Sequence, residues 1–210
     1  MMIIAIDGTA AAGKSTLARR IARHYGLPHL DTGALYRAVA RDVIGAGYAL
    51  TDAKAAAVAA RHLDPATLSD PNLRLKGNGE AASVVAAIAE VRAELLTFQR
   101  NFAGQPGGAV VEGRDIGTVV CPDAPAKIFV TASLGSRARR RYAELTGYGV
   151  VTTEETVLRE IEERDRRDRE RPISPLRPAE GALLLDTTEL DIEKAFAAAL
   201  ELIDKIASRR

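Results

Sequence analysis

Short apolar runs alternate with longer amphipathic stretches along almost the whole chain. The apolar runs are Ile3–Ile6, Pro28–Leu30, Ala109–Val111, Lys127–Thr131 and Ala182–Leu185. Between them, apolar residues recur every three or four positions, which is the spacing of a helix that packs one face on a core. Strands that alternate with helices are typical of βαβ units. The pattern therefore predicts an α/β fold with a mostly parallel sheet.

Helix start and stop signals support this interpretation. A helix is expected over Lys14–Tyr25, because Gly26 follows it and Leu17, Ala18 and Ile21 share one face. A second helix is expected to begin after Asp31-Thr32-Gly33. Thr152-x-x-Glu155 predicts a capping box, and Ile192, Phe196, Leu200 and Ile203 predict a C-terminal amphipathic helix.

Two regions interrupt the alternation of strands and helices. Residues 46–102 are rich in alanine and helical in pattern, and residues 146–178 are dominated by charge. We expect both to be lobes inserted into one domain spanning residues 1–210, whose core comprises residues 1–45, 103–145 and 179–210.

Composition narrows the classes of function. The chain has 210 residues, 47% of them hydrophobic, which suits one substantial core. Its 29 basic and 28 acidic residues leave a net charge of +1, too little for a nucleic-acid-binding surface. The first apolar run begins within two residues of the N-terminus, and no apolar run approaches ~20 residues. We expect a cytoplasmic monomer with no nucleic-acid or membrane partner.

The most specific motif spans residues 8 to 15 and reads Gly-Thr-Ala-Ala-Ala-Gly-Lys-Ser. It matches G-x-x-x-x-G-K-[ST], the phosphate-binding loop or P-loop, and it directly follows the apolar run Ile3–Ile6. In this context the backbone N–H groups and the helix N-terminus bind phosphate. Lys14 can reach the β- and γ-phosphates, and the Ser15 hydroxyl can ligate Mg²⁺. The motif indicates a nucleoside triphosphate but not the reaction.

Polar residues follow three of the predicted strands. They are Asp31-Thr32-Gly33-Ala34-Leu35-Tyr36-Arg37, Glu112-Gly113-Arg114-Asp115 and Asp186-Thr187-Thr188. In open α/β sheets, ligands bind beyond the carboxyl ends of the strands. Each of these residues alone could be a helix cap or a surface residue, but together they favour a site at that edge.

The charged region carries a second signal. From Arg159 to Arg171, six arginines are interspersed with six acidic residues. Such a run usually forms a solvated helix surface, but Val157, Ile161, Arg164, Asp168 and Arg171 step by 4, 3, 4 and 3 and form one stripe. A stripe that begins apolar and becomes charged predicts a mobile lid that brings arginines to an anionic ligand.

The acceptor of the phosphoryl group follows partly from which residues are present. A hydroxyl acceptor needs a general base, whereas a phosphate monoester is already nucleophilic at neutral pH and needs arginines instead. Arg37, Arg114, Arg164 and Arg171 supply them, and no histidine or lone strand-end carboxylate stands out as a base. This favours a nucleotide acceptor over a sugar or small alcohol.

These motifs resemble those of bacterial cytidylate kinases. The matching segments are Ile6-Asp7-Gly8 with the P-loop, residues 31–37, Gly113-Arg114-Asp115-Ile116-Gly117-Thr118-Val119-Val120, Pro122-Asp123-Ala124, the run from Glu163 to Arg171, and Leu185-Asp186-Thr187-Thr188. The resemblance implies a P-loop NTPase-type three-layer fold with a five-stranded parallel sheet, an acceptor-binding lobe over residues 46–102 and a lid over residues 146–178. It also implies phosphoryl transfer from ATP with Mg²⁺ to CMP or dCMP, giving ADP and CDP or dCDP.

The resemblance assigns a role to each matching residue. The ATP phosphates would lie on Gly8, Thr9, Ala10, Ala11, Ala12, Gly13, Lys14, Ser15 and Thr16. The acceptor would be bound by Thr32, Tyr36, Arg37, Ser83, Arg92, Arg114, Asp115, Arg164, Asp168 and Arg171, with Ser83, Arg92 and Asp115 at the cytosine edge. Lys14, Arg114, Arg164 and Arg171 would be the catalytic residues.

The chain departs from the family pattern in two places. The P-loop has Thr9-Ala10-Ala11 where the family usually has a sequence like Pro-Ser-Gly, so its geometry depends on fewer glycines. The acceptor lobe lacks a stretch between Glu80 and Ala81, which defines a short form.

Two alternatives stay open at this stage. The first is that the chain is another small P-loop kinase, which acts on adenylate or on a coenzyme A precursor. Only residues 113–120 and the pair Ser83 and Arg92 argue against this interpretation. A nucleotide switch of the GTPase kind would need an Asn/Thr-Lys-x-Asp element, which the sequence lacks.

Overall fold

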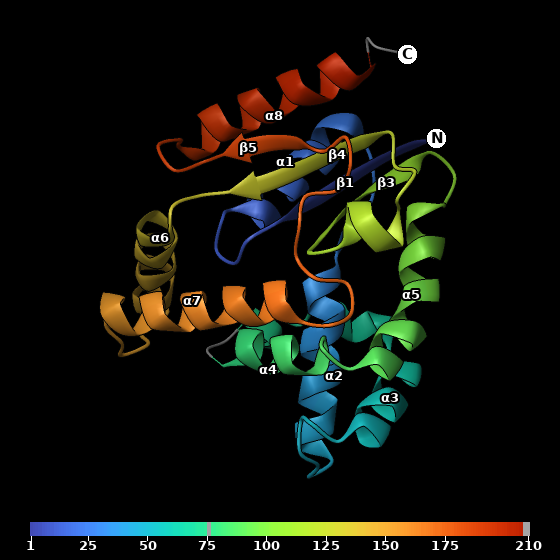
Figure 1. The fold of residues 1–210 in the computed structure, drawn as a ribbon, viewed down its shortest axis with the longest axis vertical. Helices are drawn as coiled ribbons and strands as arrows, with labels where there is room; N and C mark the ends of the chain where they lie inside the picture. Colours follow the sequence, from blue (N-terminus) through green and yellow to red (C-terminus); the bar gives the residue numbers. More distant parts are fainter. Residues whose placement is uncertain (75–76, 208–210) are drawn as a thin grey trace.

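Five parallel strands form one sheet in the order β2-β3-β1-β4-β5 (Figure 1). The computed structural model describes residues 1–74 and 77–207. Its strands are β1 (Met2–Gly8), β2 (His29–Asp31), β3 (Gly108–Gly113), β4 (Ala126–Thr131) and β5 (Leu183–Asp186). Each lies within one or two residues of its predicted run, so the strand predictions are confirmed. Asp7 pairs with Gly113 of β3 and with Phe129 of β4, so the central strands end at the same edge.

Helices cover both faces of the sheet and give the three layers that the sequence predicts (Figure 1). Because side chains of a strand alternate between faces, Ile4 and Ile6 pack with α1 (Lys14–Tyr25) and α8 (Ile192–Ala207). Ala5 packs on the opposite side with α2 (Thr32–Gly45) and α5 (Ala89–Ala103).

Two groups of helices extend beyond the sheet. The first comprises α3 (Ala53–Arg61), the short turns η1 (Pro65–Ser69) and η2 (Pro71–Arg74), and α4 (Asn78–Val85), which pack on α2 and α5. The second comprises α6 (Leu134–Gly147) and α7 (Glu154–Glu170), which share a small apolar cluster with Ala10 of the P-loop. A π-helical turn, η3 (Ile116–Val120), follows β3. Glu80 and Ala81, between which the sequence analysis expects a missing stretch, lie inside α4.

The structure corrects three local expectations. Helix α7 is capped by Thr153, whose hydroxyl accepts from the Thr156 N–H at 3.1 Å, and not by Thr152 one residue earlier. Ile203 is buried and Phe196 packs against the core as predicted, but Ile192 is exposed, and Ala195 and Ala199 complete the buried face of α8. Arg171 caps the C-terminus of α7 in an extended conformation and is not part of the helix. Over residues 1–74 and 77–207, no helix is both long enough and apolar enough to cross a membrane.

Candidate active site

The P-loop lies between two glycines, Gly8 at the end of β1 and Gly13 before α1, and both have a positive φ that favours glycine. Gly8 has φ +149°, and a Cβ added there would lie 1.9 Å from the Val130 carbonyl oxygen of the neighbouring strand. Gly13 has φ +85° and is the N-cap of α1, so the N-terminus of this helix opens into the loop. Ala11 also takes a left-handed conformation, with φ +56°, although it carries a side chain. The loop thus keeps its shape with an alanine at a position that favours glycine.

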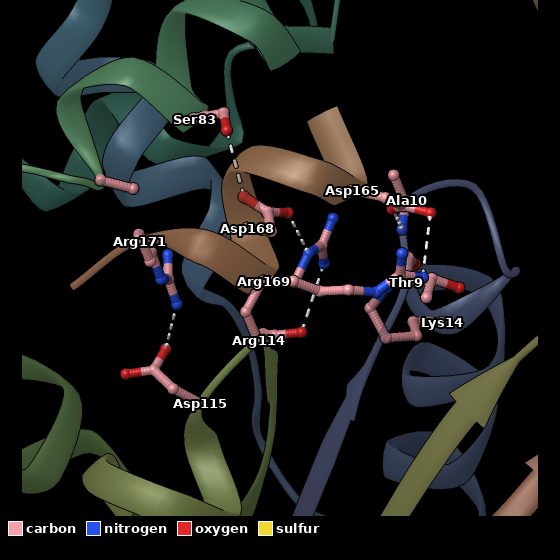
Figure 2. Close-up of polar contacts among 12 residues, drawn as sticks. Thr9, Ala10, Lys14, Ser83, Arg114, Asp115, Asp165, Asp168, Arg169 and Arg171 are labelled. Atoms are coloured by element: carbon pink, nitrogen blue, oxygen red, sulfur yellow. Dashed lines mark hydrogen bonds and ion pairs between the residues drawn. The ribbon is translucent and has the colours of Figure 1, made fainter. Parts of the chain in front are cut away.

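Lys14 is a buried cation at the start of α1. Its Nζ donates to the Thr9 carbonyl oxygen at 2.5 Å, so the side chain folds back over the loop (Figure 2). Burial, followed by the charge of Arg114, lowers the pKa of Lys14 well below its usual value, and Glu112 only partly opposes this. A buried ammonium group of this kind is stabilised by an incoming anion.

Glu112 joins this site from the end of β3, and the sequence reasoning did not assign it a role. Its Oε2 accepts from the Ser15 hydroxyl at 2.9 Å, and its Oε1 lies 3.0 Å from Nε2 of His29. Its backbone oxygen accepts from the Thr32 hydroxyl at 2.8 Å. The only sequence signal was its position directly after a strand, next to Gly113-Arg114-Asp115. A carboxylate and a serine hydroxyl side by side form an oxygen donor set suited to Mg²⁺.

Asp168 of α7 connects three segments of the site. Its Oδ1 accepts from the Ser83 hydroxyl of α4 at 3.1 Å, and its Oδ2 accepts from Nε of Arg114 at 2.8 Å (Figure 2). Burial raises the pKa of Asp168, but the charges of Arg114 and Arg164 outweigh burial and lower it to about 2. The carboxylate is therefore ionised at neutral pH and holds Arg114 at the strand end.

A second buried cluster lies beside it. Arg92 of α5 donates to Asp115 and to the Ala86 carbonyl oxygen, and its guanidinium lies 5.5 Å from the centre of the Tyr36 ring. Nη2 of Arg171 is 3.6 Å from the other oxygen of Asp115 (Figure 2). One carboxylate thus lies between two guanidinium groups, which leaves a net positive charge here.

Four arginines have nitrogens that are buried without a hydrogen-bond partner in the described part of the chain. Three of these residues line the cavity described below, with the free nitrogen at Nε of Arg37, Nε of Arg164 and Nη2 of Arg171. The fourth nitrogen, Nε of Arg167, belongs to a residue outside that cavity. Arg37 is ion-paired with Asp31 at 2.8 Å, whereas Arg164 lies against Gly79 of α4. Burial, followed by the charge of Arg114, lowers the pKa of Arg164 to about 10. Unsatisfied guanidinium nitrogens are costly, and phosphate oxygens would satisfy them.

One cavity of about 680 Å³ brings these groups together. Of the predicted site residues, those that line it are Ala10, Ala11, Ala12, Gly13, Lys14, Ser15, Thr16, Thr32, Tyr36, Arg37, Ser83, Arg114, Asp115, Arg164, Asp168 and Arg171. Gly8, Thr9 and Arg92 do not line it, but Arg92 contacts three residues that do: Asp115, Ala86 and Tyr36. The cavity continues past Arg140 to Leu190 and Ile192 near the start of α8, residues that the sequence did not predict.

Four of the five residues of the predicted stripe lie on α7, and the fifth, Arg171, caps its C-terminus. Val157, Ile161 and Asp168 are buried and Arg164 is half-buried, and all five line the cavity. Arg166, off the stripe, is 56% exposed and pairs with Glu163 and Glu170 on the outer surface. The helix therefore has one face toward the cavity and one face toward solvent.

A phosphate-binding loop at the edge of a parallel sheet, facing a cavity lined with arginines, defines the class of P-loop nucleotide-binding proteins. The sequence profile of the family described as Cytidylate kinase matches residues 4–205. The chain belongs to this family.

Curated relatives agree with the profile. A cytidylate kinase from Methylocella silvestris is 58% identical over 97% of this chain and 94% of its own length. Cytidylate kinases from Xanthobacter autotrophicus and Bradyrhizobium diazoefficiens are 59% and 52% identical over 97% and 100% of this chain, and over 97% and 99% of their own lengths. A gluconokinase from Sinorhizobium meliloti of known structure aligns with a TM-score of 0.54 at 17% identity, over 99% of this chain and 94% of its own. This likeness concerns the fold alone.

Proposed function

We propose that the protein transfers a phosphoryl group from ATP to CMP or dCMP and is a nucleoside monophosphate kinase. One feature of the structure supports this activity independently of the family. Arg37, Arg114, Arg164 and Arg171 all line the cavity that holds Lys14 of the P-loop. A donor phosphate chain and an acceptor phosphate bring several negative charges together, and closely spaced guanidinium groups offset their repulsion.

The P-loop holds the ATP phosphates in this proposal. Residues 10–16 line the cavity, and the Lys14 ammonium group would stabilise the negative charge of the phosphoryl group during transfer. Ser15 and Glu112 would hold Mg²⁺, which neutralises charge on the phosphates when bound. Their hydrogen bond at 2.9 Å keeps both oxygens at the same place beside the loop.

The acceptor phosphate needs no general base. Its second pKa is about 6, so the attacking oxygen is already ionised at neutral pH. What it needs is orientation, and Arg37, Arg114 and Arg171 provide it, with Thr32 and Tyr36 beside them. Arg164 and Asp168 act from α7 toward the acceptor sugar and the phosphates.

The base would be selected by Ser83 together with Arg92 and Asp115. A carboxylate and a guanidinium match the donor and acceptor atoms of the cytosine edge, and a wrong base would leave one of them buried and unpaired. Because Asp115 is 4% exposed, such a mismatch would be costly.

Two parts of the chain would move around this site. Residues 46–102, which contain α3, α4 and α5, would form the acceptor lobe, and residues 146–178, which contain α7, would form the lid. The remaining segments form the core of one domain. We also propose that the enzyme acts as a monomer, because one chain supplies the whole cavity.

A coupled assay of ADP release, run with ATP and Mg²⁺ against each nucleoside monophosphate, tests the proposal. We expect CMP and dCMP to be phosphorylated faster than AMP or GMP. Faster turnover of AMP would show that the base-selecting roles are wrong, and turnover of none of them would overturn the activity.

A further inference from the structure

Asp165 of α7 ties this helix to the P-loop. Its Oδ1 accepts from the Ala10 N–H at 3.1 Å (Figure 2), and its Oδ2 accepts from Nη1 of Arg137 at 2.6 Å. Asp165 and Arg137 are 2% and 4% exposed, and neither lines the cavity. Neither residue is among the site residues predicted from the sequence.

Arg137, in the first turn of α6, completes this contact. Its Nη1 also donates to the Ala10 carbonyl oxygen at 3.1 Å, and its Nε donates to the Ala132 carbonyl oxygen at 2.9 Å. Side chains therefore hold both the N–H and the C=O of Ala10. We call Asp165, Arg137 and the Ala10 backbone together the clasp.

The clasp lies directly before the strained position of the loop. Ala11, at φ +56°, takes a conformation that residues with a side chain avoid and that persists only where the surroundings enforce it. Because side chains bond the N–H and the C=O of Ala10, which belong to the two peptide groups that precede Ala11, Ala11 has little freedom to relax. The clasp thus supplies part of the loop geometry that glycines supply elsewhere.

The same turn of α7 also contacts the acceptor side. Asp168, three residues after Asp165, bonds Ser83 of α4 and Arg114 at the end of β3, and Arg164 lies against Gly79 of α4. Asp165 and Asp168 are neighbours on the surface of α7, joined by the hydrogen-bonded backbone of one helical turn. A shift of the P-loop that pulls on Asp165 therefore moves Asp168 and Arg164 with it.

We propose that Asp165 and Arg137 are positioning residues that couple the donor and acceptor sites. Occupation of the P-loop fixes Ala10, the clasp fixes α7, and α7 places Arg164 and Asp168 for the acceptor. The proposal rests on the proposed function, since it requires both nucleotides to bind. It differs from a merely structural ion pair, because a structural pair would change stability without changing how one ligand affects the other.

Calorimetry on the full chain tests this. The dissociation constant of CMP is measured with and without a non-hydrolysable ATP analogue and Mg²⁺, and the ratio of the two values is the coupling. For the unaltered protein we expect the analogue to tighten CMP binding by about 5-fold or more, within the usual range for coupled sites. In Asp165→Asn we expect the ratio to fall to within about twofold of one, while CMP alone binds as before.

Two further variants keep the test decisive. Glu162→Gln makes the same carboxylate-to-amide change at an exposed position of α7 and should keep the full coupling. The double variant Arg137→Met with Asp165→Leu removes both buried charges together, so neither is left unpaired, and it should lose the coupling even if Asp165→Asn folds poorly. Full coupling in the double variant, or none in the unaltered protein, would overturn the clasp. An unaltered protein that binds neither nucleotide would overturn the proposed function as well.

Discussion

Arg164 offers the sharpest test of the site, because its contributions to stability and to turnover have opposite signs. Burial, followed by the charge of Arg114, lowers its pKa to about 10. At about 1.4 kcal/mol per tenfold change in proton affinity, the charged side chain costs the ligand-free fold about 3 kcal/mol. Since the folded-state pKa lies below the unfolded one, this cost is present in full at neutral pH and declines only above pH 10.

Arg164→Ala removes this cost together with two methylene groups, whose burial contributes at most about 1.5 kcal/mol. We therefore expect the ligand-free variant to be about 1 kcal/mol more stable, with a Tm higher by about 2–4 °C. At the same time the variant loses a guanidinium group whose buried Nε has no hydrogen-bond partner within the described residues and could donate to a phosphate oxygen. We expect kcat/KM for CMP to fall by at least ~100-fold, since an arginine on developing phosphoryl charge is worth that much or more.

Arg166→Ala is the matched control on the same helix. Arg166 pairs with Glu163 and Glu170 at the surface, so we expect little change in either quantity. Coupled ADP-release kinetics and thermal unfolding followed by circular dichroism measure both variants. Equal kinetic effects at positions 164 and 166 would refute the argument from the stripe. A loss of stability greater than 1 kcal/mol in Arg164→Ala would refute the argument from burial.

Two other substitutions follow from the same reasoning. Lys14→Met removes the positive charge at the P-loop, so turnover should fall by ~1,000-fold or more. The Tm should not decrease, because burial already disfavours the charged side chain and lowers its pKa well below the usual value. Near-normal turnover would show that the P-loop does not serve the chemistry. Arg92→Met unpairs Asp115 from its nearest guanidinium and should raise the KM for CMP and reduce the preference for CMP over UMP about tenfold or more. That preference compares two substrates on the same folded molecules, so lost stability alone cannot alter it, and an unchanged ratio would contradict the base-selecting role.

Local and periodic features of the fold were accessible from the sequence. The P-loop is a contiguous segment, and its strand, turn and helix follow from an apolar run, two glycines and the spacing of Leu17 and Ile21. The α7 stripe follows from helical geometry alone, which places residues at steps of three and four on one side. At the start of α7 the local rule gave the wrong residue: the capping-box pattern selects Thr152, because Glu155 follows three residues later, whereas Thr153 caps the helix.

Contacts between distant segments depended on the tertiary structure. Ser15 and Glu112 are 97 positions apart, and Ala10 and Asp165 are 155 apart. No local propensity brings such residues together; sheet pairing places β3 beside β1, and the apolar cluster of Ala10, Val157 and Ile161 seats α7 on the loop. Asp165 stood in the sequence among five other acidic residues of the same run. Only packing showed that this carboxylate is buried and bonded to the P-loop, because the cost of burying a charge depends on the partner that the fold supplies.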